Sequence, residues 1–354
     1  MAKHRIFGYC TPWSVKPGDA MRFMISAEGV TEARATLVRL LHGDENAAGP
    51  GFVEEAVPGA MPDRLHVRRQ FTQKGSYAQV SGMEVHDVAD GSFTLAGFVF
   101  PTAPGTRRQT MLGRWDISGS QGWALGINPE GHLEFWVGDG QDVDQVTAEV
   151  PLIPRSWYFV AATWDAATKR ARLVQLGRVG RYNGKLGLVA PYDYDSIVTS
   201  VLNTAPKAAV AEAPFLWAGA SDWNDQRGRF VETLYNGKID RTGLWNRVLS
   251  DDEIQAISAG AEPVSQGLVA WWDPTLGYTD TGIGDTIQDV GPHGLHAQGM
   301  NRPVRGMTGW NWQGRDDSYR LNPGQYGGVH FHDDAMTDCR WEPTVEWTVL
   351  KGLK

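Results

Sequence analysis

Residues 156–165 have the sequence SWYFVAATWD, and this stretch decides the fold class. It predicts a strand from Trp157 to Trp164, and a second strand is predicted from Ala171 to Leu176. The residues between them, 165–169, are a short polar loop, so the two strands form a hairpin. This part of the chain is therefore expected to be β-structure.

Three earlier segments show the alternation of apolar and other residues that is typical of strands. They are 93–99, 123–127 and 133–137, and Asn128-Pro129-Glu130-Gly131 makes the last two a hairpin. Because these short strands follow one another without helical patterns between them, the sequence favours a β-sandwich or jelly roll over an α/β fold.

One short helix is predicted at residues 251–259. Ser250 is suited to be its N-cap, and Glu253 three residues later completes a capping box. Ile254 and Ile257 give it an apolar stripe, and Gly260 can end it in the left-handed conformation.

The two ends of the chain each carry one more alternating strand. The apolar positions are Met21, Phe23 and Ile25 near the start, and Val345, Trp347 and Val349 near the end. Since both strands need partners, they are expected to pair in a small β unit. The predicted organisation is N-terminal strands and a linker over 1–60, a jelly roll over 61–262, and an irregular segment rich in Trp and Gly over 263–354 that returns to the N-terminal β unit.

Composition excludes several classes of function. The chain has 33 basic and 41 acidic residues and a net charge of −8, so it lacks the positive field that holds nucleic acid. No segment approaches the roughly 18 apolar residues that span a membrane, and no signal peptide is evident, so a cytoplasmic location is expected. Cys10 and Cys339 are expected to be reduced thiols, which could lie near each other if the terminal strands share a sheet.

Several motifs resemble successive strands of a laminin-G-like, concanavalin A-like jelly roll. They are Gly75-Ser76-Tyr77-Ala78-Gln79-Val80, residues 92–99, residues 156–165, and Tyr235-Asn236-Gly237-Lys238-Ile239-Asp240 followed by residues 244–254. They occur in the expected order over about two hundred residues, as such domains require. The resemblance implies an all-β sandwich.

A second resemblance covers nearly the whole chain and concerns the N-terminal half of the large (β) subunit of N,N-dimethylformamidase. The segments that carry it are Gly8-Tyr9-Cys10, 37–44, 48–52, Gly309-Trp310-Asn311-Trp312, Gln325-Tyr326-Gly327 and 338–342. That family hydrolyses an N-substituted formamide to formate and an amine. The resemblance implies that the iron, held by tyrosine and acidic ligands, belongs to a C-terminal domain that is expected to lie beyond the part of the family that this chain resembles.

The resemblance implies a non-catalytic scaffold with no cofactor of its own. Its implied partners are the missing C-terminal catalytic domain, a small subunit and a second copy of the chain. The alternative is a free-standing laminin-G-like module that binds a glycan or a protein. Trp271, Trp272, Trp310 and Trp312 are candidate contact residues, because aromatic side chains are enriched at interface centres.

Two clusters could hold a metal ion. On a strand, His330 and His332 would point to one face, and Asp333 follows them, a set suited to iron or zinc. Asp139, Asp142 and Asp144 have the odd spacing of a calcium loop but lack its glutamate at the twelfth position. Turn residues without a metal are the competing interpretation of both clusters. Glycoside hydrolysis is disfavoured, because Glu134 has no acidic partner on its strand face.

Overall fold

The structure is a computed structural model that describes residues 5–46, 48–59, 61–178, 194–225, 227–279, 282–311, 327–333 and 341–348. The chain forms two compact units. Unit 1 comprises Met1–Gln73 together with Cys339–Lys354, and unit 2 comprises Lys74–Asp338. These bounds differ from the predicted divisions at residues 60 and 262.

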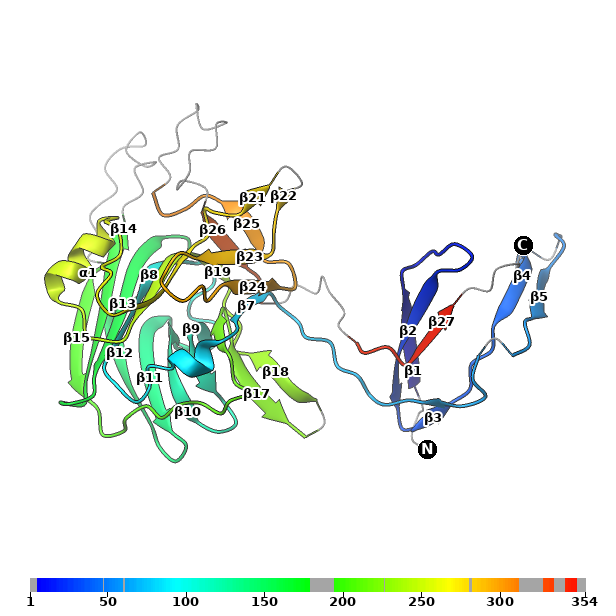
Figure 1. Cartoon of the computed structure of the whole chain (residues 1–354), viewed down its shortest axis with the longest axis horizontal. Helices are drawn as coiled ribbons and strands as arrows, with labels where there is room; N and C mark the ends of the chain where they lie inside the picture. The colour runs from blue at the N-terminus through cyan, green and yellow to red at the C-terminus, as the bar shows by residue number, and fades with distance from the viewer. Residues whose placement is uncertain are drawn as a thin grey trace, which may run out of the picture. The chain divides into compact units, whose positions relative to one another are not determined.

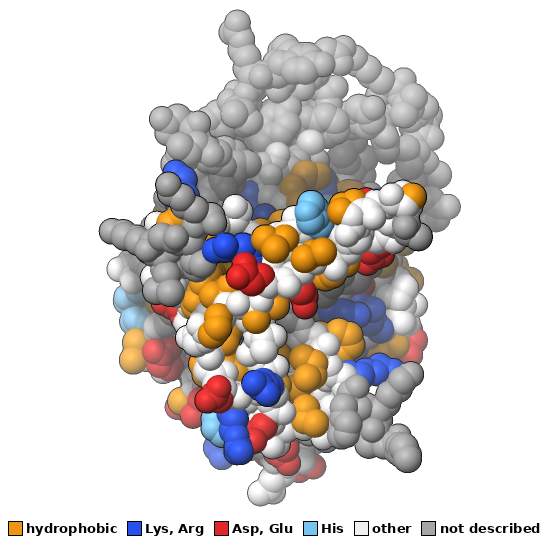
Figure 2. Space-filling model, turned by 90° about the vertical axis from the view of Figure 1, so that its right-hand side faces the viewer, with side chains coloured by type: hydrophobic (Ala, Val, Ile, Leu, Met, Phe, Trp, Pro, Cys, Tyr) orange, Lys and Arg blue, Asp and Glu red, His pale blue; other side chains and the backbone are white. Residues whose placement is uncertain are grey.

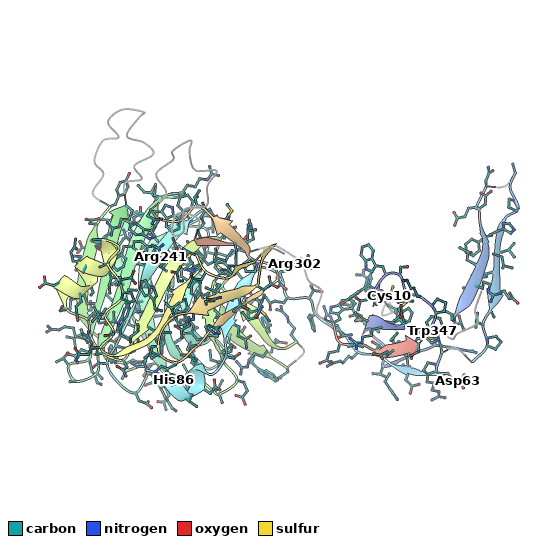
Figure 3. The ribbon with its side chains drawn as sticks, turned by 45° about the horizontal axis from the view of Figure 1, so that its top comes forward. Cys10, Asp63, His86, Arg241, Arg302 and Trp347 are labelled. Atoms are coloured by element: carbon teal, nitrogen blue, oxygen red, sulfur yellow. The ribbon has the colours of Figure 1, made fainter. Side chains whose placement is uncertain are left out.

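Unit 1 contains a three-stranded antiparallel sheet in the order β1-β2-β27 (Figure 1). β1 is Arg5–Thr11, β2 is Ala20–Glu28 and β27 is Val345–Thr348. Met21 lies opposite Trp347, so the two ends of the chain share one sheet, as the sequence predicts. Figure 3 labels Cys10 on β1 and Trp347 on β27 in this sheet. Cys10 forms no disulfide with a described residue, and Cys339 lies outside the described residues, so the proximity of the two stays a prediction.

Two short ribbons complete unit 1. One pairs β3 (Glu32–Ala33) with β6 (Leu65–His66), and the other pairs β4 (Val38–Gly43) with β5 (Phe52–Ala56).

Unit 2 is a jelly-roll-like sandwich of two sheets (Figure 1). The first sheet has the order β12-β11-β10-β9-β16-β7-β24. Its strands are β7 (Tyr77–Val80), β9 (Gln109–Asp116), β10 (Gln121–Ile127), β11 (His132–Asp139), β12 (Val143–Pro151), β16 (Phe215–Trp217) and β24 (Ala297–Met300), and the hairpin of β17 (Ala220–Asn224) and β18 (Gly228–Glu232) joins it at β9.

The second sheet has the order β15-β14-β13-β8-β19, with β20 and β26 sharing the other edge of β19. Its strands are β8 (Phe93–Pro101), β13 (Trp157–Asp165), β14 (Arg170–Arg178), β15 (Ser196–Val201), β19 (Gly237–Trp245), β20 (Leu268–Asp273), β25 (Val304–Met307) and β26 (Gly328–Phe331). β23 (Thr286–Asp289) pairs with β20 and with β24, which links the two sheets. The short elements are a 3-10 helix at Met83–His86 and the strands β21 (Tyr278–Thr279) and β22 (Gly282–Ile283).

The stretch that predicted the fold class forms β13, and its alternation sorts the side chains between two layers. Tyr158 and Trp164 belong to the core between the sheets, whereas Phe159 and Ala161 belong to a second apolar cluster on the opposite face. A strand buried on both faces has few polar residues, because successive side chains point to opposite faces and neither face meets water.

The helix α1 (Asp251–Ser258) covers that second cluster with Ile254 and Ile257. Its N-terminus has the predicted capping box, in which Ser250 accepts a hydrogen bond from the Glu253 backbone and the Glu253 side chain accepts one from the Ser250 backbone. The helix therefore begins where the sequence predicts.

We expect Ser250→Ala to destabilise the protein by about 1 kcal/mol, because the backbone N–H of Glu253 loses its acceptor. Urea unfolding would measure the change in the free energy of unfolding. Ser265→Ala is the control, since Ser265 is exposed outside the helix. Equal stability of the two variants would contradict a role of the cap.

The segment predicted to be irregular from residue 263 instead contains strands from β20 to β26. Sequence patterns missed them because most are short and pair with distant strands: β20 and β26 with β19, and β24 with β7.

Candidate binding pocket

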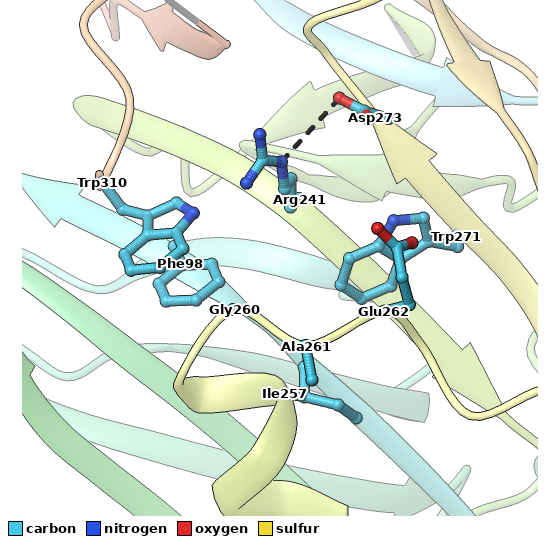
Figure 4. A pocket seen from close by; sticks show the side chains of 9 residues that line it. All are labelled: Phe98, Arg241, Ile257, Gly260, Ala261, Glu262, Trp271, Asp273 and Trp310. Atoms are coloured by element: carbon cyan, nitrogen blue, oxygen red, sulfur yellow. Dashed lines mark ion pairs between the residues drawn. The ribbon is translucent and has the colours of Figure 1, made fainter. Parts of the chain in front are cut away.

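A pocket of about 130 Å³ opens on the outer side of the second sheet, next to the C-terminal end of α1 (Figure 4). Three strands, the helix α1 and two loops line it. The lining residues are Phe98 on β8, Arg241 on β19, Trp271 and Asp273 on β20, Ile257 on α1, the loop residues Gly260, Ala261 and Glu262, and Trp310. All belong to unit 2, so the sandwich and its covering helix position them.

One wall of the pocket is a stacked aromatic pair. The rings of Trp310 and Phe98 are nearly parallel, with an interplanar angle of 5° and centroids 4.2 Å apart. The guanidinium of Arg178 lies 5.6 Å from the Trp310 centroid and 5.7 Å from the Phe98 centroid, within the range of cation–π attraction. Burial lowers the pKa of Arg178.

The opposite side of the pocket carries charge. Nε of Arg241 lies 4.0 Å from Oδ1 of Asp273 (Figure 4). The exposed Glu262 adds a second carboxylate, and Trp271 packs between the pocket and the helix cluster. The pocket therefore combines aromatic walls with both signs of charge.

A fully buried carboxylate, that of Asp240, lies behind the Trp310 wall. Its Oδ2 accepts a hydrogen bond from the Trp310 backbone at 3.2 Å, and its Oδ1 has no partner among the described residues. Burial raises the pKa of Asp240 to about 6, against the lowering effect of the Arg241 charge. The hydrogen bond ties the position of Trp310 to the strand β19.

This arrangement is suited to binding a small ligand. The polar groups among the described lining residues are the Arg241 guanidinium, the carboxylates of Asp273 and Glu262, and the two indole N–H groups. Aromatic faces with a few polar groups are typical of sites that orient a small polar ligand or a side chain of a partner.

The four predicted contact tryptophans have different surroundings. Trp271 and Trp310 line the pocket, and Trp312 lies outside the described residues. Trp272 is fully buried between the two sheets, stacks on Phe215 and donates a hydrogen bond from its indole nitrogen to the Leu295 carbonyl at 2.6 Å. The prediction for Trp272 is corrected, because a core residue cannot contact a partner.

Sequence analysis missed Asp240, Arg241, Asp273, Glu262 and Phe98. A usable signal was present in Lys238-Ile239-Asp240, where two charged residues flank an apolar one in an otherwise buried strand. Their alternation places both charges on the outer face of the second sheet.

His330 and His332 lie on one face, as predicted, with ring centroids 4.3 Å apart. Asp333, however, pairs with Arg107 and accepts a hydrogen bond from Asn236 at 2.8 Å. The described residues contain no group of three His, Cys, Asp or Glu side chains placed to hold a metal ion. A metal bound by His330, His332 and Asp333 stays a prediction, which elemental analysis of the purified chain would test.

The predicted calcium loop makes the contacts of a turn. Oδ1 of Asp139 accepts hydrogen bonds from the backbones of Gln141 at 2.8 Å and Asp142 at 2.9 Å. These bonds lower the pKa of Asp139. Asp144 accepts a hydrogen bond from the backbone of Asn203 at 2.7 Å. The carboxylates of Asp139 and Asp144 therefore both accept hydrogen bonds from backbone N–H groups of loops.

We expect His330 to make stability depend on pH. Burial, with smaller effects of the His332 and Lys238 charges, lowers its pKa to about 4 from the usual 6.5. Because the folded state resists protonation of His330, the contribution of this residue to stability should fall as pH falls from 6.5 to 4, and it should be absent above that window. His330→Gln should lose this dependence in urea unfolding across the pH range, whereas exposed His42→Gln should retain it.

The sandwich defines a concanavalin A-like jelly-roll fold with a pocket on the outer face of one sheet. Residues 72–175 match the profile of the Concanavalin A-like lectin/glucanases superfamily. The chain is 39% identical over 356 residues, 99% of its length, to the N,N-dimethylformamidase beta subunit of Paracoccus aminophilus, and 38% identical over 358 residues to that of an Alcaligenes species. These matches confirm the resemblance found in the motifs.

The chain spans about half the length of the curated relatives it matches, with 46% of each covered. Among solved structures, the CBM40 module of the Ruminococcus gnavus IT-sialidase is 16% identical to it, with 53% of this chain and 95% of that chain covered and a TM-score of 0.39. In the part of the chain that the structure describes, no helix is both long enough and apolar enough to cross a membrane.

Proposed function

We propose that this chain is the non-catalytic, structural portion of an N,N-dimethylformamidase-type large subunit. The observation that carries the proposal is the identity of 39% over 99% of the chain, combined with coverage of 46% of the relative. In this role the chain works in the cytoplasm and positions a catalytic portion that hydrolyses an N-substituted formamide to formate and an amine.

Iron belongs to the catalytic portion in this proposal. The described residues do not fit an iron site, since no group of three possible ligands converges among them and Asp333 is engaged by Arg107 and Asn236. The proposed partners are the rest of such a subunit, the small subunit and further copies. Nucleic acid is not proposed as a partner, because the net charge is −8.

The test is formate release from N,N-dimethylformamide by the purified chain, with and without added iron and together with elemental analysis. The expected result is a folded protein that releases no formate and holds no iron. Formate release with stoichiometric iron would overturn the structural role and direct attention to His330, His332 and Asp333.

The pocket favours a second candidate, a free-standing module that binds a glycan or a protein. Its aromatic wall of Trp310 and Phe98, opposite Asp273 and Glu262, could hold a polar ligand. Glycan-array binding that Trp310→Ala abolishes would support this candidate, and the absence of binding would leave the structural role.

A further inference from the structure

The two-stranded ribbon of β4 and β5 has no buried face. Every residue of both strands is exposed, although the ribbon carries several large apolar side chains. The exposed fraction is 55% for Leu40 and 57% for Phe52. An isolated two-stranded ribbon is at best marginally stable in water, so this one requires a covering surface.

Three of the five large apolar side chains of this ribbon lie on one face, whereas Val53 lies on the other and Leu41 is unpaired at a register shift. Val38 lies opposite Ala56, and Leu40 lies opposite Glu54, so these residues share a face with Phe52. A Cβ at Gly43, the residue opposite Phe52, would lie 3.2 Å from Cδ2 of Leu40, so the Leu40 side chain extends along this face. We call Val38, Leu40, Phe52 and Ala56 the ribbon face.

The other side of the ribbon is more polar. Arg39 lies opposite Glu55 with their charged groups 3.9 Å apart, and His42 lies opposite Val53. Val53 shares the side of this ion pair and Glu54 shares the ribbon face, so both sides are mixed and the ribbon face is the more apolar of the two. The more apolar side is the one expected to pack on another surface.

Exposure of apolar side chains is concentrated in unit 1. Among the described residues, nearly half of the exposed large apolar side chains belong to this unit, which is only a quarter of the chain. Trp13 is the most exposed of them, at 90%. Figure 2 shows hydrophobic side chains that reach the surface on the face turned toward the viewer.

Unit 1 has little core of its own to compensate. Its buried apolar cluster consists, among the described residues, of Ala27, Leu65 and Val67. No residue of β4 or β5 belongs to it. The ribbon therefore gains little stability from the rest of unit 1.

We infer that the ribbon face is a docking surface for the part of the subunit that the curated relatives possess and this chain does not span. This inference rests on the proposed function. The relatives are about twice as long as the chain, since 46% of each is covered, so they contain a further polypeptide large enough to cover the ribbon face. Asp44, Glu45 and Glu54 are acidic residues at or beside the ribbon, and Glu55 is paired with Arg39, so an apolar partner surface with a basic rim would complement it.

To test this inference, the aligned part of the Paracoccus aminophilus beta subunit is replaced by this chain. The resulting chimera is co-expressed with the remaining subunit of that enzyme. Hydrogen exchange of residues 38–43 and 52–56 is compared between the chimera and the chain alone. We expect fast exchange in the chain alone and at least tenfold slower exchange in the chimera. Leu40→Glu combined with Phe52→Glu should abolish the protection.

The matched control is Val201→Glu, which changes an exposed apolar residue at 64% exposure on β15 of unit 2. It should leave the protection of the ribbon unchanged. A chimera that releases formate while its ribbon exchanges as fast as in the chain alone would overturn the docking surface and leave the proposed function standing.

Two other outcomes would also overturn the docking surface, and the first of them would overturn the proposed function as well. A chimera that does not assemble, or that assembles and releases no formate, would overturn the proposed function and the docking surface with it. A dimer of the chain alone in multi-angle light scattering, dissociated by the double substitution, would assign the ribbon face to a second copy and would also overturn the inference.

Discussion

Trp272→Ala is expected to lower the free energy of unfolding by about 3 to 5 kcal/mol, the range for truncating a fully buried tryptophan. The indole lies between the two sheets, stacked on Phe215 and edge-on to Trp217, and its N–H donates to Leu295. The substitution leaves a cavity and an unpaired carbonyl in the core. Urea unfolding followed by circular dichroism would measure the change.

Trp223→Ala is the control for this prediction. Trp223 lies on β17 and is half exposed, so its loss should cost less than about 1 kcal/mol. Trp272→Phe keeps most of the stacking and should fall between the two alanine variants. If Trp272→Ala were no more destabilising than Trp223→Ala, the indole would not be a core group and its role as a contact residue would return.

The strands of the sandwich could be predicted from the sequence where local alternation is strong. β13 and β14 are joined by a four-residue loop, and each strand buries one face in the core. β20 is different, since its sequence, Leu268 to Asp273, is short and its partner β19 lies more than twenty residues earlier. No local sequence pattern indicates a partner strand at that distance, so this segment was predicted to be irregular.

If β20 had been predicted as a strand, the different surroundings of Trp271 and Trp272 would have followed from the sequence. Successive residues of a strand point to opposite faces, so Trp272 enters the core while Trp271 faces the α1 cluster and the pocket. Without the strand, both were equally plausible contact residues. The pocket itself was beyond sequence reasoning, because Phe98, Asp273 and Trp310 come together only when β8, β20 and a distant loop meet.

Asp240 provides the second large effect, which has the opposite sign to that of His330. Burial raises the pKa of Asp240 to about 6 from 3.8. Among the described residues, Oδ1 of this carboxylate accepts no hydrogen bond that would favour the ionised form. Above pH 6 the group is ionised in both the folded and the unfolded state, and the folded state carries the full cost of a buried charge. As pH falls from 6 toward 4 the folded state takes up the proton first, so stability rises and the cost disappears below the unfolded pKa.

Asp240→Asn is therefore expected to stabilise the protein at pH 7 by up to about 3 kcal/mol, the equivalent of a shift of about two pKa units. The side-chain oxygen of asparagine can still accept the hydrogen bond from the Trp310 backbone, so the substitution removes the charge and keeps this contact. The gain in the free energy of unfolding should shrink to nothing near pH 4, measured by urea unfolding between pH 4 and 7.

Asp90→Asn is the control for this prediction. It removes an exposed carboxylate and should change stability by less than about 0.5 kcal/mol at either pH. A loss of stability in Asp240→Asn at pH 7 would mean that Arg241 stabilises the ionised carboxylate by more than burial costs, and the contribution of Asp240 to stability would then fall, rather than rise, as the pH falls through 6.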